Sequence, residues 1–168
     1  MSYKEKRIIA SIITGILVLA AYGIYAAVRY QSGMAAPEDM KFWALTILAF
    51  IGIGIAVSVV TQILFHVLIA AAVAVKESGQ NGKDGDKRVE EVIGAEMVED
   101  EMDKLISLKA MKFSFVIAGM GFVAALVSIV LGYSPVVMLN ILFVSFCTGS
   151  LAEGFIQLYF YRRGIKHG

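Results

Sequence analysis

The sequence has few of the residues that build redox, metal and catalytic sites. Its 168 residues include one cysteine and two histidines, His66 and His167. A single cysteine, Cys147, excludes an internal disulfide and any metal site made of several thiolates. No P-loop, H-E-x-x-H, C-x-x-C or G-x-S-x-G motif occurs. We therefore expect no catalytic residues, no metal site and no cofactor, and we predict that the protein is not an enzyme.

Charge is also scarce, and hydrophobic residues take its place. Charged residues make up 17% of the chain and hydrophobic residues 58%, whereas soluble domains have roughly 25% and 45–50%. An apolar excess of this size requires lipid as the solvent. We predict a single membrane domain over residues 1–168. The net charge of +1 gives no indication of a nucleic-acid partner.

Four apolar runs are long enough to cross a bilayer, which takes about 20 residues of helix. They cover approximately residues 8–28, 42–67, 113–132 and 136–158. The runs do not alternate in polarity, and open sheet edges cannot be satisfied in lipid. The predicted fold is therefore all-α, a polytopic four-helix transmembrane bundle with a cytoplasmic helical hairpin at 68–112. A cleavable signal peptide is the alternative for the first run, although its 21 residues exceed the usual apolar core of about 7–15.

The positions of the basic residues predict the orientation. Thirteen of the 15 Lys and Arg residues lie in 4–7, 76–112 and 162–166, and only Arg29 and Lys41 lie elsewhere. Because basic residues concentrate in cytoplasmic segments, we expect both termini and the central segment to be cytoplasmic.

The central segment predicts a recognition surface rather than a lipid anchor. Between residues 76 and 112, ten acidic residues outnumber seven basic ones. Apolar residues recur every three or four positions from Arg88 onward, which is typical of an amphipathic helix. Since no proline or glycine follows Gly94 before the third run, we expect one continuous helix that enters the membrane. The candidate cytoplasmic interaction surface comprises Asp100, Asp103, Lys104, Lys109, Arg162 and Arg163.

A few polar residues interrupt the apolar runs. Glu153 is costly within a membrane helix, and such a carboxylate usually faces the bundle or water. Gln62 and His66 are one turn apart at a similar depth, and Gln157 is one turn beyond Glu153. We predict an intramembrane polar cluster of Glu153, Gln157, Gln62 and His66. Two interpretations stay open: mutual hydrogen bonding of buried polar groups, or proton, cation or ligand handling.

Small residues recur at helical spacing in the third and fourth runs. Such seams allow close approach of membrane helices. The third run carries Ser114, Ala118, Gly121, Ala125, Ser128 and Gly132, and the fourth carries Ser145 and Gly149. We predict that these seams pack against neighbouring helices.

Residues 100–109, DEMDKLISLK, resemble the signature D-E-R-D-K-L-I-E-L-K of a family of prokaryotic four-span membrane proteins of unknown function. Met102 and Ser107 replace the arginine and the second glutamate. The ending YFYRRG at 159–164 is similar to that family's Y-Y-Y-R-R-G. The resemblance implies a bacterial or archaeal plasma membrane and a gene often accompanied by a small helix-turn-helix regulator. It implies no activity, catalytic residue or cofactor.

Three functions follow as hypotheses. The first is a regulatory or accessory subunit in the lipid bilayer that binds a protein partner through its cytoplasmic face. The alternative is a small transporter or channel component that uses Glu153 and His66. Since four spans in 168 residues seldom enclose a pathway alone, the alternative requires a homo-oligomer. A lipid-modifying enzyme is the third.

Overall fold

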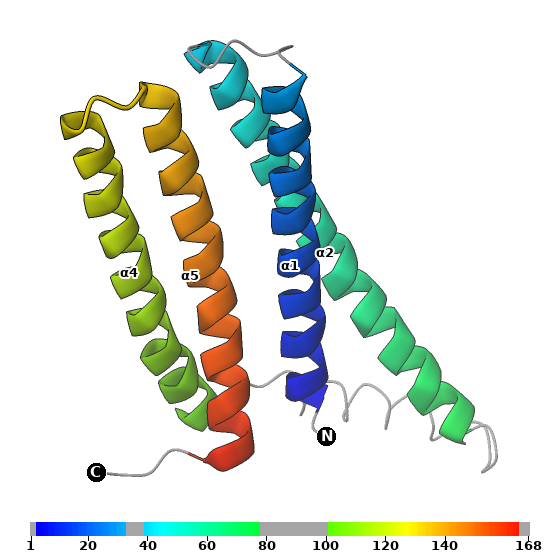
Figure 1. Cartoon of the computed structure of the whole chain (residues 1–168). Coiled ribbons are helices and arrows are strands. Elements are labelled where there is room, and N and C mark those ends of the chain that lie inside the picture. The colour runs from blue at the N-terminus through cyan, green and yellow to red at the C-terminus, as the bar shows by residue number, and fades with distance from the viewer. Residues whose placement is uncertain (1–2, 33–38, 78–100, 165–168) are drawn as a thin grey trace.

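The computed structural model describes residues 3–32, 39–77 and 101–164, and these residues form four long helices. Each helix is long and apolar enough to cross a membrane, and no strand occurs in the described ranges. The helices are α1 (Tyr3–Gln31), α2 (Met40–Glu77), α4 (Glu101–Val130) and α5 (Pro135–Arg163) (Figure 1). The predicted all-α four-helix bundle is confirmed.

Consecutive helices run in opposite directions along the bundle (Figure 1). The start of α1 and the end of α5 therefore lie at one end, which we call the terminal end. The end of α2 and the start of α4 lie there as well. The opposite end, the turn end, holds the α1–α2 connection and the short turn between α4 and α5.

Helices α4 and α5 form the most extensive contact in the bundle, and small residues make it possible. A Cβ atom added to Gly121 would lie 2.0 Å from Ser145 Oγ, and one added to Gly149 would lie 3.0 Å from the Ser114 carbonyl oxygen. Gly121 and its seam neighbours Ala125 and Ser128 are buried. The predicted seam packing is confirmed for Ser114, Gly121, Ser145 and Gly149, whereas Gly132 lies in the turn after α4 and a Cβ there would meet nothing within 4 Å. A tight turn joins the pair, and Gly132 occupies the left-handed region there with φ +83°.

Helix α1 packs on α5 through a second close approach. A Cβ added to Gly15 would lie 2.8 Å from Leu151, and one added to Gly154 would lie 2.8 Å from Ile12. Nearer the turn end, the Tyr22 hydroxyl donates a 2.5 Å hydrogen bond to Asn140 Oδ1. The Tyr22 side chain is 2% exposed and has edge contacts with Phe50 and Phe143. This bond therefore joins α1 to α5 in a dry, aromatic environment.

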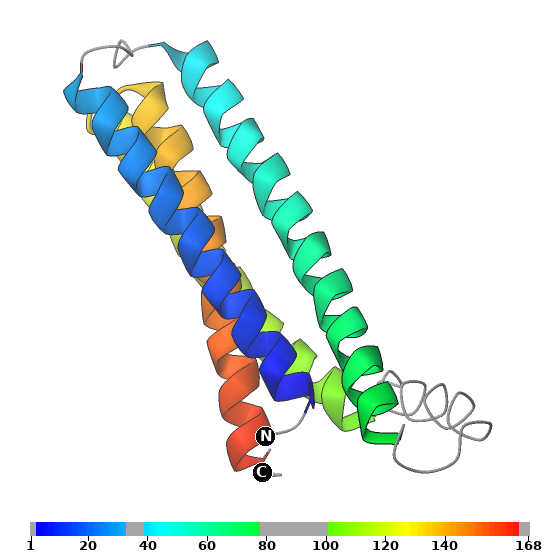
Figure 2. The ribbon, with the colours of Figure 1, turned by 90° about the vertical axis from the view of Figure 1, so that its right-hand side faces the viewer.

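Helix α2 lies at the edge of the bundle (Figure 2) and diverges from α1 toward the terminal end (Figure 1). It contacts α1 and, less extensively, α5. Its 38 residues extend about 57 Å at about 1.5 Å each, well beyond a hydrocarbon core of about 30 Å. The apolar run from Phe42 is thus part of one helix that is longer than the bilayer is thick. Only its beginning is deeply packed, where Trp43 is 3% exposed against Val136.

The structure describes only part of the predicted cytoplasmic hairpin at 68–112, namely residues 68–77 and 101–112. Helix α4 begins at Glu101 and continues unbroken to Val130. The predicted continuity between the amphipathic segment and the third span is therefore observed from residue 101 onward. Residues 78–100, which include most of the hairpin and Asp100, lie outside the described residues.

Candidate functional site

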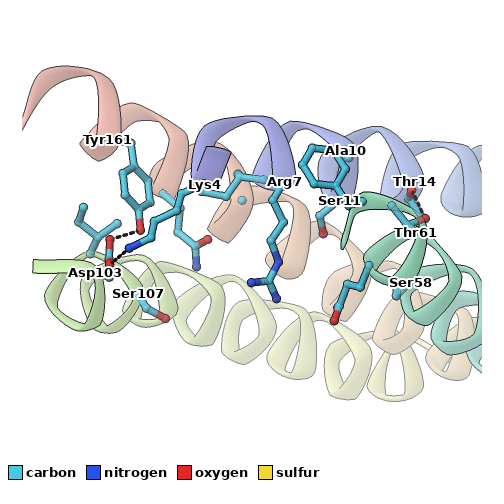
Figure 3. Close-up of a pocket in the computed structure, with 16 residues that line it drawn as sticks. Lys4, Arg7, Ala10, Ser11, Thr14, Ser58, Thr61, Asp103, Ser107 and Tyr161 are labelled. Carbon is cyan, nitrogen blue, oxygen red and sulfur yellow. Dashed lines mark hydrogen bonds and ion pairs between the residues drawn. The ribbon is translucent and has the colours of Figure 1, made fainter. Parts of the chain in front are cut away.

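A cavity of about 500 Å³ lies toward the terminal end, where α2 diverges from α1 (Figure 1). All four helices contribute to its lining, which combines charged, hydroxyl, amide and apolar side chains (Figure 3). The lining residues are Lys4, Arg7, Ile8, Ala10, Ser11 and Thr14 of α1; Ser58, Thr61, Gln62 and Phe65 of α2; Asp103, Ile106 and Ser107 of α4; and Gly154, Gln157 and Tyr161 of α5. No cavity built from one helix pair could combine these groups.

A network of three polar side chains closes one wall of the cavity. The Lys4 ammonium forms an ion pair with the Asp103 carboxylate, and the Tyr161 hydroxyl donates a 2.6 Å hydrogen bond to the same carboxylate (Figure 3). The Asp103 side chain is 11% exposed. Because the three residues belong to α1, α4 and α5, this network fixes the relative height of these helices at the terminal end.

Helices α1 and α2 approach each other toward the middle of the bundle. The hydroxyl oxygens of Thr14 and Thr61 lie 3.5 Å apart, which joins α1 to α2 at the cavity lining (Figure 3). About two turns nearer the turn end of α2, a Cβ added to Gly54 would lie 3.8 Å from the Val18 side chain of α1. The two helices are thus in contact from this level toward the turn end.

Arg7 is the charged residue of the cavity lining that does not belong to the Lys4–Asp103–Tyr161 network. Its side chain extends from α1 into the space between α1, α2 and α4 (Figure 3). Lys4 and Asp103 neutralise each other as an ion pair. Within the described part of the chain, Arg7 has neither a hydrogen-bond nor an ion-pair partner. The charged lining residues thus carry a net charge of +1, located on the Arg7 guanidinium.

The structure brings part of the predicted polar cluster together. Gln157 Nε2 donates a 3.2 Å hydrogen bond to Glu153 Oε1. Gln157 and Gln62 line the same cavity, on α5 and α2. Glu153 is half-buried but does not belong to the cavity lining. The side chain of His66 lies outside the described ones, so its place in the cluster stays a prediction.

The residues of the predicted interaction surface have different environments. Lys104, Arg162 and Arg163 are exposed, and Lys109 is half-buried. Arg163 lies over the ring of Tyr159, 5.4 Å from its centroid. Asp103 instead faces the interior, where it holds the network described above, and Asp100 lies outside the described residues. The exposed part of this surface is therefore cationic.

The described residues contain no group of three or more His, Cys, Asp or Glu side chains that could hold a metal ion. The cavity contains one carboxylate, that of Asp103, and lysine and tyrosine already occupy it. Its other groups are hydroxyls, amides and a guanidinium, which recognise polar or anionic ligands by hydrogen bonding.

In the sequence, Lys4 and Arg7 support only the predicted orientation, whereas in the structure both line the cavity. A signal was present in the spacing. Lys4, Arg7, Ser11 and Thr14 are separated by three, four and three residues, which places them on one face of a helix. Ser58, Thr61 and Gln62 form a matching polar face on α2. Two facing polar stripes at the same end of two membrane helices indicate a polar cavity between them.

Comparison of the chain with protein families, with curated proteins and with solved structures finds no match.

Proposed function

We propose that this protein is a non-enzymatic regulatory or accessory subunit of a prokaryotic plasma membrane, with both termini cytoplasmic, that binds a protein partner through its terminal end. The charge distribution supports the orientation, because 13 of the 15 basic residues belong to this end or to the segment joining α2 to α4. The resemblance of residues 100–109 to a prokaryotic membrane family agrees with this location.

The observation that carries the proposal is the Lys4–Asp103–Tyr161 network at the terminal end. It joins three helices at the level where Lys104 and Arg162 are exposed. A fixed helix arrangement presents these cations in a defined geometry, which lowers the entropic cost of binding a partner. Their exposure leaves them available for electrostatic complementarity, which gives specificity and a fast association rate.

A photo-crosslinking experiment in native membranes tests this proposal. A photoreactive residue at position 104 should crosslink to a discrete protein partner. The same residue at position 133, where Tyr133 is 59% exposed at the turn end, serves as the matched control. Charge reversal by Arg162→Glu should lower the yield at position 104 several-fold, because it removes electrostatic complementarity. Equal crosslinking at the two positions, or no protein crosslink at 104, would contradict the proposal.

The shape of the cavity favours a second candidate, a small oligomeric transporter or channel component. A polar cavity at one end of the bundle, lined by all four helices, is expected for a protein that alternates in access. In this function Glu153 and His66 would be protonatable groups. Glu153→Gln should reduce flux in proteoliposomes, whereas Glu101→Gln, at an exposed position of α4, should not. Equal flux in the Glu153→Gln variant and the unmodified protein would exclude a role for that carboxylate.

A further inference from the structure

We propose that the cavity is a binding site for the phosphate group of an anionic ligand, with the Arg7 guanidinium as its anchor. This inference goes beyond the proposed protein partner and does not depend on it. It rests on the charge of the lining, on the hydrogen-bonding groups around Arg7 and on the position of the cavity along the helices.

Lys4 and Arg7 differ in whether a carboxylate neutralises their charge. Both side chains line the cavity, but the Lys4 charge is neutralised by Asp103. Arg7 has no carboxylate partner among the described residues. A cation near a low-dielectric medium is stabilised by an opposite charge, and the cavity leaves room for that charge to come from a ligand. Arginine suits phosphate best, because its planar fork donates two parallel hydrogen bonds to phosphate oxygens.

The neighbouring polar groups complete the recognition of a phosphate. Ser11 lies one turn from Arg7 on the same face of α1, and Ser58 faces the cavity from α2 (Figure 3). Ser107 contributes a further hydroxyl from α4. Each hydroxyl can donate one hydrogen bond, and phosphate oxygens are acceptors. Hydroxyl donors from three helices thus line the same cavity as the Arg7 guanidinium, and no described carboxylate of the lining except the occupied Asp103 competes with an anion.

The position of the cavity favours a phospholipid as the source of the phosphate. Arg7 immediately precedes the apolar run that begins at Ile8, so its guanidinium lies where the headgroups meet the hydrocarbon. Ile8, Phe65 and Ile106 give the same cavity an apolar portion, which could contact the glycerol and the first acyl carbons. Basic pockets between membrane helices bind acidic headgroups in this way. A soluble phosphate ester offers the same anionic chemistry without the acyl chains.

Ligand binding to the purified full-length protein, measured by native mass spectrometry, tests the proposal. The ligands are phosphatidic acid, phosphatidylcholine and inorganic phosphate. We expect phosphatidic acid to bind about tenfold more tightly than phosphatidylcholine, and Arg7→Gln to remove most of that difference. The matched control is Lys6→Gln, which loses the same charge from the adjacent position; both side chains are exposed, but only Arg7 lines the cavity. Equal losses in the two variants, or no loss in Arg7→Gln, would overturn the proposal.

The ligand series also identifies the source of the phosphate. Phosphatidic acid binding that inorganic phosphate does not displace supports a lipid ligand. Arg7-dependent binding of inorganic phosphate with equal affinity supports a soluble phosphate ester in the same site. If neither phosphatidic acid nor inorganic phosphate binds, the proposal that the cavity is a phosphate-binding site is overturned.

A second pair of variants tests the cavity without changing any charge. Ser58→Phe should fill part of the cavity and lower phosphatidic acid affinity several-fold. Val57→Phe adds the same ring at the adjacent position, which does not line the cavity and is 38% exposed, and should leave affinity unchanged. Thermal unfolding of both variants checks that each is folded. Unchanged affinity in a folded Ser58→Phe variant would contradict binding within the cavity.

Discussion

The hydrogen bond between Tyr22 and Asn140 joins α1 to α5 at a buried tyrosine side chain. The Tyr22 side chain is 2% exposed, and its hydroxyl lies 2.5 Å from Asn140 Oδ1. Asn140 Nδ2 also donates to the Val136 carbonyl oxygen at 2.8 Å, which fixes the orientation of the amide. A buried polar group left without its partner costs free energy, so both ends of this bond should matter for stability.

We predict that Tyr22→Phe lowers the free energy of unfolding by about 1 kcal/mol, the usual range for interhelical hydrogen bonds in membranes. The change removes one oxygen and leaves the ring contacts with Phe50 and Phe143 in place. Reversible unfolding in mixed detergent micelles measures the difference. Tyr30→Phe, at a position that is 66% exposed, should have no effect. A similar loss in both variants would show that the Tyr22 bond contributes nothing specific.

The pairing of α4 with α5 depends on the small residues of the seam. We predict that Gly121→Ala lowers the free energy of unfolding by about 2 kcal/mol, because overpacking forces helices apart. The added Cβ would lie 2.0 Å from Ser145 Oγ and 2.1 Å from Ser145 Cβ, which a rotation of the hydroxyl cannot relieve. Gly119→Ala is the matched control on the same helix, since a Cβ there meets nothing within 4 Å.

The same detergent unfolding measurement separates packing from helix propensity in these two variants. Alanine has a higher helix propensity than glycine by about 1 kcal/mol in water, so Gly119→Ala should be neutral or slightly stabilising. If Gly121→Ala were as stable as Gly119→Ala, the close approach of α4 to α5 would be wrong.

The helices and the seam could be predicted from the sequence because the information is local. About 20 apolar residues define a span, and glycine and serine at intervals of three and four define a face of one helix. The Lys4–Asp103 pair could not be predicted in this way, because its partners are 99 residues apart. Their contact depends on the relative height and rotation of α1 and α4, which the sequence of neither helix contains. For the same reason, Arg7 indicates the orientation in the sequence, but its place in the cavity lining is seen only in the structure.

The topology of the whole bundle gives the broadest prediction. Four antiparallel spans place both ends of the described chain on one side of the membrane (Figure 1). The basic residues predict that this side is cytoplasmic. Since Cys147 is the only cysteine, Cys147→Ser gives a background in which single cysteines can be labelled. On it, Lys6→Cys, Arg162→Cys and Tyr133→Cys report on the two ends of the bundle.

A membrane-impermeant maleimide should label Tyr133→Cys in intact cells and the other two variants only after permeabilisation. The four-span arrangement and the orientation are tested separately by this experiment. If only one of Lys6→Cys and Arg162→Cys were labelled in intact cells, the two residues would lie on different sides of the membrane, which would contradict an even number of spans. Joint labelling of those two in intact cells, with Tyr133→Cys protected, would keep the bundle and reverse its orientation. In that case the cavity would face the outside, and a cytoplasmic protein partner would be excluded.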